Sequence, residues 1–93
     1  MSSEEQEERY VTFKILWKLF HQGLWGKGHI AKRDICKGLP PEQVNLCFTV
    51  LEDLRKANIV GRKRHKHGDP YRYFLNRNKY REITDFLEKF GEA

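Results

Sequence analysis

The chain has 93 residues, 39% of them apolar and 13% aromatic, which suits one small domain with a single core and excludes a disordered chain. No stretch approaches the roughly 20 apolar residues of a membrane-spanning helix, and the acidic start MSSEEQEERY lacks the apolar segment of a secretory signal. We therefore expect a cytoplasmic protein in which residues 1–93 form a single domain.

The net charge of +5 is unevenly distributed along the chain. Residues 1–9 hold four Glu and one Arg, so the start of the chain is acidic. Residues 10–78 hold 14 Lys or Arg and five Asp or Glu, whereas residues 79–93 hold three Lys or Arg and four Asp or Glu. A basic middle between acidic ends indicates one cationic surface, of the kind that binds a polyanion.

The first predicted element is a long helix over residues 3–22, ended by Gly23. Its apolar residues cover more than half of the circumference, and Val11, Ile15 and Leu19 form a second apolar face. The core of so small a chain covers one face of a helix, so we interpret the second face as a contact with another copy.

A short strand at His29–Ile30 is followed by a short helix over residues 31–37 and by the clearest helix, over residues 41–57. Pro41 suits the first turn of this helix, and Asn58 is expected to end it in a left-handed conformation. Apolar residues at helical spacing predict its core face: Val44, Cys47, Phe48, Leu51 and Leu54.

Residues 59–76 are predicted to form a β-hairpin, because apolar and polar residues alternate on both sides of the turn HGDP. A last helix over residues 79–90 has apolar residues spaced 3, 4 and 3 apart, the seam of a helix pair. The two helical seams together predict a homodimer through Val11, Ile15, Leu19, Tyr80, Ile83, Leu87 and Phe90.

The two cysteines, Cys36 and Cys47, lie eleven residues apart without a CxxC motif. In a small domain of a reducing compartment we expect them to be buried thiols. A disulfide is the alternative if the source is a thermophile.

The order of these elements predicts an α+β fold that is mostly α, a helix-turn-helix followed by a basic hairpin. The segment VLEDLRKANIVGRKR resembles the winged helix-turn-helix transcriptional regulators, with Leu51, Leu54, Asn58, Ile59 and Val60 in the pattern of that family. Asn58 stands where the family usually has Gly. The resemblance covers roughly half of the chain and implies a helix-turn-helix at 31–37 and 41–57, a small antiparallel β-wing at 59–76 and an additional C-terminal helix. The long first helix and the apolar last helix also resemble the dimerisation helices common in this family.

A helix-turn-helix lays its second helix in the major groove. We therefore expect base contacts from Gln43, Asn45 and Thr49. The side-chain amides of Gln and Asn can pair with adenine, and the methyl group of Thr can contact thymine. Simple solvation of these side chains is the alternative. The preceding helix is expected to contact the DNA backbone through Lys32, Arg33 and Lys37, which would fix register without reading sequence.

The first strand of the hairpin carries charge on both faces, so it must project into solvent beyond Val60. We expect it to lie along a minor groove or a phosphate backbone, the alternative being a solubilising basic loop. The expected wing contacts are Arg62, Lys63, Arg64, His65, Lys66 and Arg72.

No metal site or cofactor is expected, since His65, His67 and the cysteines lack the ligand spacing of a zinc site. Catalytic motifs are missing from the sequence, so we do not expect an enzyme, and no small-molecule effector is predictable. The predicted function is sequence-specific binding of double-stranded DNA by a homodimeric transcriptional regulator. A winged-helix protein–protein interaction module and a non-specific DNA- or RNA-binding protein are the alternatives.

Overall fold

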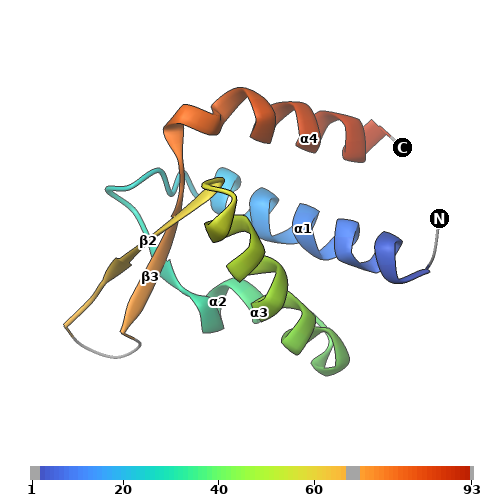
Figure 1. The fold of residues 1–93 in the computed structure, drawn as a ribbon, viewed down its shortest axis with the longest axis horizontal. Helices are drawn as coiled ribbons and strands as arrows, with labels where there is room; N and C mark the ends of the chain where they lie inside the picture. Colours follow the sequence, from blue (N-terminus) through green and yellow to red (C-terminus); the bar gives the residue numbers. More distant parts are fainter. Residues whose placement is uncertain (1–2, 67–69, 93) are drawn as a thin grey trace.

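A computed structural model describes residues 3–66 and 70–92, so the predicted turn at 67–69 lies outside the described residues. The elements are α1 (Ser3–His21), β1 (Ile30–Ala31), α2 (Lys32–Cys36), α3 (Pro41–Lys56), β2 (Val60–Arg64), β3 (Tyr71–Leu75), the 3-10 helix η1 (Arg77–Lys79) and α4 (Tyr80–Glu92) (Figure 1). The prediction of a mostly helical α+β fold is confirmed. Within the described ranges, no helix is long and apolar enough to cross a membrane.

The three strands form one antiparallel sheet in the order β1-β3-β2. β2 and β3 are the predicted hairpin, in register from Val60 opposite Leu75 to Arg64 opposite Tyr71. The short first strand lies one residue later than predicted, and its residue Ile30 pairs with Tyr73 on the far edge of β3. The strand β3 is therefore paired on both of its edges, while the far end of the hairpin projects from the body of the molecule (Figure 1).

Two asparagines fix the base of the hairpin. Asn58 adopts φ 63°, the left-handed conformation predicted for the end of α3. Its carbonyl accepts a hydrogen bond of 2.6 Å from Asn76 Nδ2, and the Asn76 side chain also accepts one of 3.0 Å from the Asn78 amide. The chain is thus locked where it enters β2 and where it leaves β3, and Asn76 caps the turn that leads into α4.

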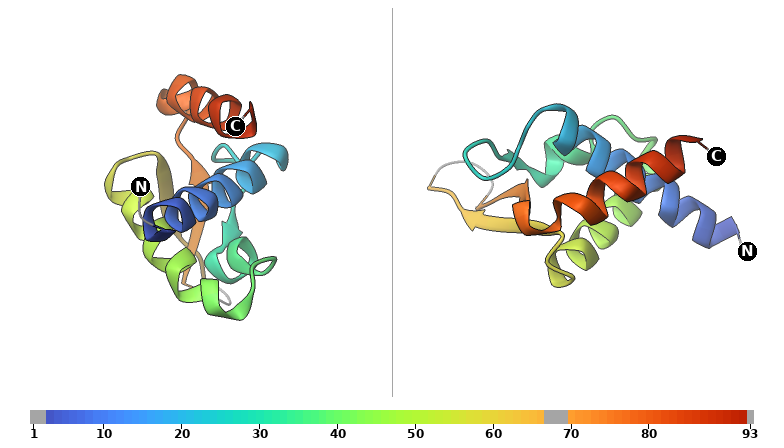
Figure 2. Two further views of the ribbon diagram at one scale, coloured as in Figure 1. Left: turned by 90° about the vertical axis from the view of Figure 1, so that its right-hand side faces the viewer. Right: turned by 90° about the horizontal axis from the view of Figure 1, so that it is seen from above.

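The helix α1 is covered on two sides by its own chain. α3 packs against it, and α4 lies across it (Figures 1 and 2). The exposed fractions of Val11, Ile15 and Leu19 are 0% in this single chain. Ile83 and Leu87 of α4 are also buried, and Phe90 stacks on Phe13 with ring centres 4.6 Å apart.

These contacts correct the predicted dimer seam. Of its seven residues, five are buried in the core of one chain, and Tyr80 is the member that is clearly exposed, at 55%. The prediction assumed that one chain could cover only one face of α1. It was wrong for these residues because α3 and α4 of the same chain cover α1 on two sides, with α4 on the side of Phe13 and Phe20.

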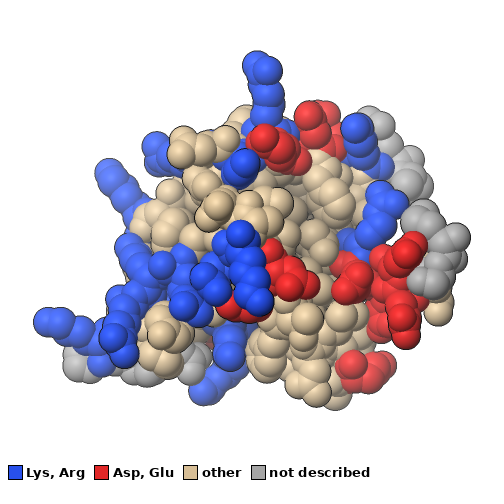
Figure 3. All heavy atoms as spheres, viewed as in Figure 1, with Lys and Arg blue, Asp and Glu red and all other residues tan. Residues whose placement is uncertain are grey.

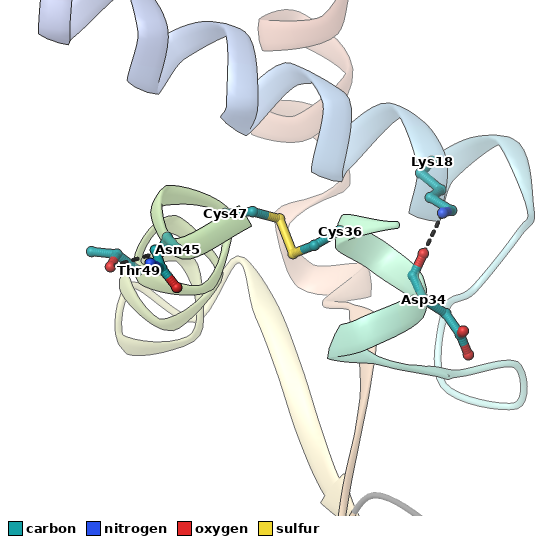
Figure 4. The surroundings of a disulfide bond; sticks show 6 residues. All are labelled: Lys18, Asp34, Cys36, Asn45, Cys47 and Thr49. Carbon is teal, nitrogen blue, oxygen red and sulfur yellow. Dashed lines mark hydrogen bonds between the residues drawn. A yellow bond between two sulfur atoms is a disulfide. The ribbon is translucent and has the colours of Figure 1, made fainter. Parts of the chain in front are cut away.

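The cysteines form a disulfide, so the expectation of two free thiols was wrong (Figure 4). The packing of α2 against α3 brings the Cα atoms of Cys36 and Cys47 to 6.0 Å, a separation that a disulfide spans. Lys18 of α1 donates a hydrogen bond to the Asp34 carbonyl of α2. The short helix α2, only five residues long, is therefore attached to both of its helical neighbours.

Candidate nucleic-acid interface

The predicted wing residues come together on the β2–β3 hairpin. Lys and Arg side chains gather over this hairpin, at the lower left of Figure 3. Four of the six are exposed, and His65 and Arg72 are half-buried. Strand alternation divides them between two faces. We call the side that carries Val60, Tyr73 and Leu75 into the core the inner face, and the opposite side the outer face.

On the inner face, Arg62 lies between an aromatic ring and a carboxylate. Its guanidinium carbon is 4.0 Å from the centre of the Tyr71 ring, and its Nη1 is 3.9 Å from Glu52 Oε2 of α3. Arg55 also donates to Glu52, through Nε at 3.0 Å and through Nη2. The Arg55 hydrogen bond lowers the pKa of Glu52, and the positive charges of Arg55 and Arg62 add to this effect. Arg62 is thus held at the junction of α3 and the hairpin.

On the outer face, Lys63 and Arg72 are directly paired across the strands. Lys63 Nζ passes over β3 and donates a 3.0 Å hydrogen bond to the Gly26 carbonyl. The rings of His29 and His65 have centres 6.0 Å apart. Burial lowers the pKa of His29, and the charges of Lys63, Arg72 and His65 lower it further. The outer face therefore carries a concentrated positive potential.

Two features of this face were missed in the sequence. His29 was not predicted as a contact residue, although pairing the predicted strand at His29–Ile30 with β3 would have placed it beside the hairpin. Gly61 was not singled out, yet a Cβ there would lie 2.4 Å from Phe74 Cε2. The Phe74 ring thus packs directly over the Gly61 backbone, and no signal in the sequence alone indicated this contact.

The predicted backbone contacts on α2 are exposed. Lys32, Arg33 and Lys37 all have exposed side chains, and Lys32 Nζ is 4.9 Å from the centre of the Phe48 ring of α3. α2 packs against β1 and β3. Its basic residues consequently extend the positive surface of the hairpin toward α3.

The predicted base contacts on α3 do not share one environment. Asn45 and Thr49 are exposed, and the Thr49 hydroxyl donates a 3.1 Å hydrogen bond to the Asn45 carbonyl one turn earlier (Figure 4). Gln43 is half-buried, and its Nε2 donates to Glu7 Oε1 of α1 at 3.3 Å. Gln43 therefore faces α1 and not the solvent, which does not favour the base contact predicted for it.

The start of α3 lies beside a group of carboxylates. Glu42 and Leu46 line a hollow together with four residues of α1: Glu4, Glu5, Glu7 and Glu8. The acidic residues at the start of the chain were evident in the sequence, but their position next to α3 was not. Because carboxylates repel phosphate, this end of α3 opposes a close approach of DNA, whereas the hairpin end of the molecule favours it.

Comparisons of the chain with protein-family models, with curated proteins and with solved structures find no match. Any function must therefore be argued from the geometry and charge of the surfaces described above.

Proposed function

We propose that this chain is a winged-helix protein that binds double-stranded DNA sequence-specifically and acts as a homodimeric transcriptional regulator. The observation that carries the proposal is the basic β2–β3 hairpin, which projects from the body with exposed Arg62, Lys63, Arg64 and Lys66. Positive side chains on a projecting hairpin lie along a phosphate backbone or in a minor groove, where the negative potential is high. The exposed lysines and arginine of α2 add backbone contacts beside it.

Within this proposal, α3 reads the major groove through Asn45 and Thr49. Both lie on its exposed surface, with Asn45 one turn before Thr49. Gln43 is left out of the base-reading set because it bonds to Glu7. The carboxylates around Glu42 exclude phosphates from the start of α3, so the duplex would be held from the hairpin side.

The homodimer in this proposal uses a surface that shares only Tyr80 and Leu87 with the predicted seam. A groove of about 600 Å³ runs between α1 and α4, lined by Trp17, Phe20, Tyr80, Thr84, Leu87, Glu88 and Gly91. Trp17 is 47% exposed and separates this groove from a second hollow lined by Lys14 and Lys18. A two-fold axis through Trp17 would bring the lysines of one copy to Glu88 of the other, as a self-complementary interface requires.

A second candidate function, a protein-interaction module, is favoured by the same aromatic groove. Exposed aromatic residues around a concave apolar surface are typical of protein interfaces. In that case the groove would bind a different protein and the chain alone would remain a monomer in solution.

The test of DNA binding is a titration of a mixed-sequence duplex across a salt series. We expect affinity to fall steeply as salt rises. The double variant Arg62→Ala/Arg64→Ala should reduce the slope of log K against log salt by about 0.9 for each phosphate that the hairpin no longer neutralises. Arg81→Ala/Lys89→Ala, which removes two exposed positive charges from α4 instead, is the matched control. Absence of binding at low salt would rule out the proposal.

Selection from random duplexes separates sequence-specific from non-specific binding. We expect an enriched sequence whose preference changes in Asn45→Ala, while the hairpin variants weaken all duplexes alike. If no sequence is enriched, the chain is a non-specific binder.

A further inference from the structure

The outer face of the sheet carries a cluster of basic side chains that the proposed reading of DNA by α3 does not use. We call His29, Lys63, His65 and Arg72 the outer-face cluster. They come from three neighbouring segments: the residue before β1, the strand β2 with its continuation, and the central strand β3. Four groups that are cationic or can become so thus converge from segments far apart in the sequence.

The positions of these side chains are set by the sheet. Arg72 is in the central strand, with Lys63 opposite it on one side and Ala31 on the other. Lys63 is held across the sheet by its hydrogen bond to the Gly26 carbonyl, and its Nζ is 5.9 Å from the centre of the Phe74 ring. Because Lys63 Nζ has three donors and uses one of them on Gly26, it keeps donors for a ligand.

Two atoms of the cluster are buried without a hydrogen bond. Within the part of the chain that the structure describes, neither His29 Nδ1 nor Arg72 Nε has a partner. A buried polar atom without a partner costs free energy, which a ligand or a bridging water would recover. The charges acting on His29 are all positive, since Lys63, Arg72 and His65 each lower its pKa. The missing component is therefore an anion with several acceptor oxygens.

We propose that the outer-face cluster is a binding site for a phosphate group. Its oxygens would accept hydrogen bonds from Lys63 Nζ, from the Arg72 guanidinium and from the His29 ring, after small rotations of these side chains. A tetrahedral oxyanion suits donors that converge from several directions, and Arg with Lys is a common pair for it. The phosphate belongs either to a nucleic-acid backbone, in which case the inference rests on the proposed function, or to a free phosphate or phosphate ester.

The experiment is an NMR titration of the full chain with inorganic phosphate at constant ionic strength and pH. The probes are the ring C–H signals of the histidines and the Nε–H signal of Arg72. We expect saturable shifts at His29 and Arg72 and unchanged signals from His21, which is exposed on α1 and serves as the internal control. Bound phosphate should also raise the pH at which the His29 ring titrates, because an adjacent anion favours the charged imidazole.

Two variants test whether the phosphate is held by the outer-face cluster. Lys63→Ala should weaken phosphate binding about tenfold, as expected for the loss of a charge-assisted hydrogen bond. Lys89→Ala removes an exposed charge from α4, outside the sheet and the hairpin, and should leave the phosphate affinity within about twofold. Shifts that do not saturate, or that are equal at His21 and His29, would overturn the proposal.

A second titration with a short DNA duplex identifies the source of the phosphate. If the duplex shifts the same signals and inorganic phosphate competes with it, the site holds a backbone phosphate. If phosphate binds and the duplex does not, the site takes a free phosphate group. The proposed DNA binding is then wrong, and the proposed phosphate site stands. If the duplex binds without moving the signals of His29 and Arg72, the inference fails and DNA binding stands.

Discussion

Because Gly61 has no side chain, the Phe74 ring of β3 can pack directly over the backbone of β2. The Phe74 ring lies where a Cβ of residue 61 would be, 2.4 Å from Cε2 and 2.6 Å from Cζ. The ring in turn lies beneath Lys63, whose Nζ is 5.9 Å from its centre. The absence of a side chain at Gly61 therefore allows the Phe74 ring to lie where it can support Lys63 on the outer face.

We predict that Gly61→Ala destabilises the chain by about 1–3 kcal/mol, because Phe74 must leave its position to admit the methyl group. The measurement is the unfolding midpoint in a chemical denaturant. Gly38→Ala is the matched control, since a Cβ there meets nothing within 4 Å. Equal midpoints for the two variants would show that Phe74 moves at no cost.

Glu52 links the end of α3 to the hairpin through Arg55 and Arg62, and this predicts a dependence on pH. Its pKa is lowered in the folded chain, so the stabilisation it supplies is complete above the usual carboxyl range and is lost as the pH falls through the lowered pKa. The effect is small because the pair is partly exposed. We expect Glu52→Gln to lower the melting temperature near pH 7.

The same reasoning predicts how this difference changes in acid. The gap in melting temperature between the natural chain and Glu52→Gln should narrow as the pH falls through the lowered pKa of Glu52, because the natural carboxyl then becomes protonated as well. Asp53→Asn removes the adjacent, exposed charge and serves as the control. A gap that stays constant from pH 7 down to the acid pH at which the natural chain unfolds would contradict the role given to Glu52.

At the scale of elements, the disulfide joins the two helices that are proposed to meet DNA. α2 has five residues and is too short to be stable on its own. It is held by the bond from Cys36 to Cys47, by Lys18 and by its contacts with the sheet. These attachments fix the position of Lys32, Arg33 and Lys37 relative to Asn45 and Thr49.

We predict that removing this disulfide, as in Cys36→Ala/Cys47→Ala, costs about 3 kcal/mol of folding free energy, the value for closing a loop of this length. Chemical denaturation with and without a reductant measures it. The natural chain should lose stability in reductant and the double variant should not respond. If the natural chain is equally stable in both conditions, the bond does not contribute.

The disulfide also bears on the expected cytoplasmic location. Disulfides persist mainly in oxidising compartments, and intracellular proteins of hyperthermophiles are the recognised exception. A cytoplasmic location therefore remains a prediction, and it is compatible with this bond in a thermophilic source.

At the scale of the whole molecule, charge is separated between two ends. The glutamates at the start of α1 lie beside the start of α3, and the basic hairpin projects at the opposite end (Figures 1 and 3). Such a separation orients an approaching polyanion before contact, because the two ends respond to it with opposite sign. The proposed duplex would therefore meet the hairpin first.

The exposed aromatic groove predicts the oligomeric state. If two copies meet through Trp17, then Trp17→Ala should convert a dimer into a monomer, as measured by light scattering after gel filtration over a range of concentrations. Tyr10→Ala is the control, because Tyr10 is similarly exposed, at 42%, but does not line the groove. A natural chain that is monomeric throughout the range would exclude the dimer and favour a partner of another kind.

Much of the local structure followed from the sequence alone. Helical spacing placed α1 and α3 within one residue of their observed ends, and Asn58 was expected in the left-handed conformation that it adopts. Strand alternation likewise located the hairpin and divided its charges between two faces. These features depend on residues close together in the chain, where periodicity and backbone preference decide the outcome.

The tertiary structure decided the contacts between residues that are far apart in the sequence. It buried Val11, Ile15 and Leu19 in the core of their own chain, joined Cys36 to Cys47, turned Gln43 toward Glu7 and brought His29 beside His65. A periodic pattern states which face of a helix is apolar, but it does not state which element covers that face. The basic stretch was therefore recognisable from its residues, whereas its division into an inner face held by Glu52 and an outer face around Arg72 required the packing of α3 and the pairing of β1 with β3.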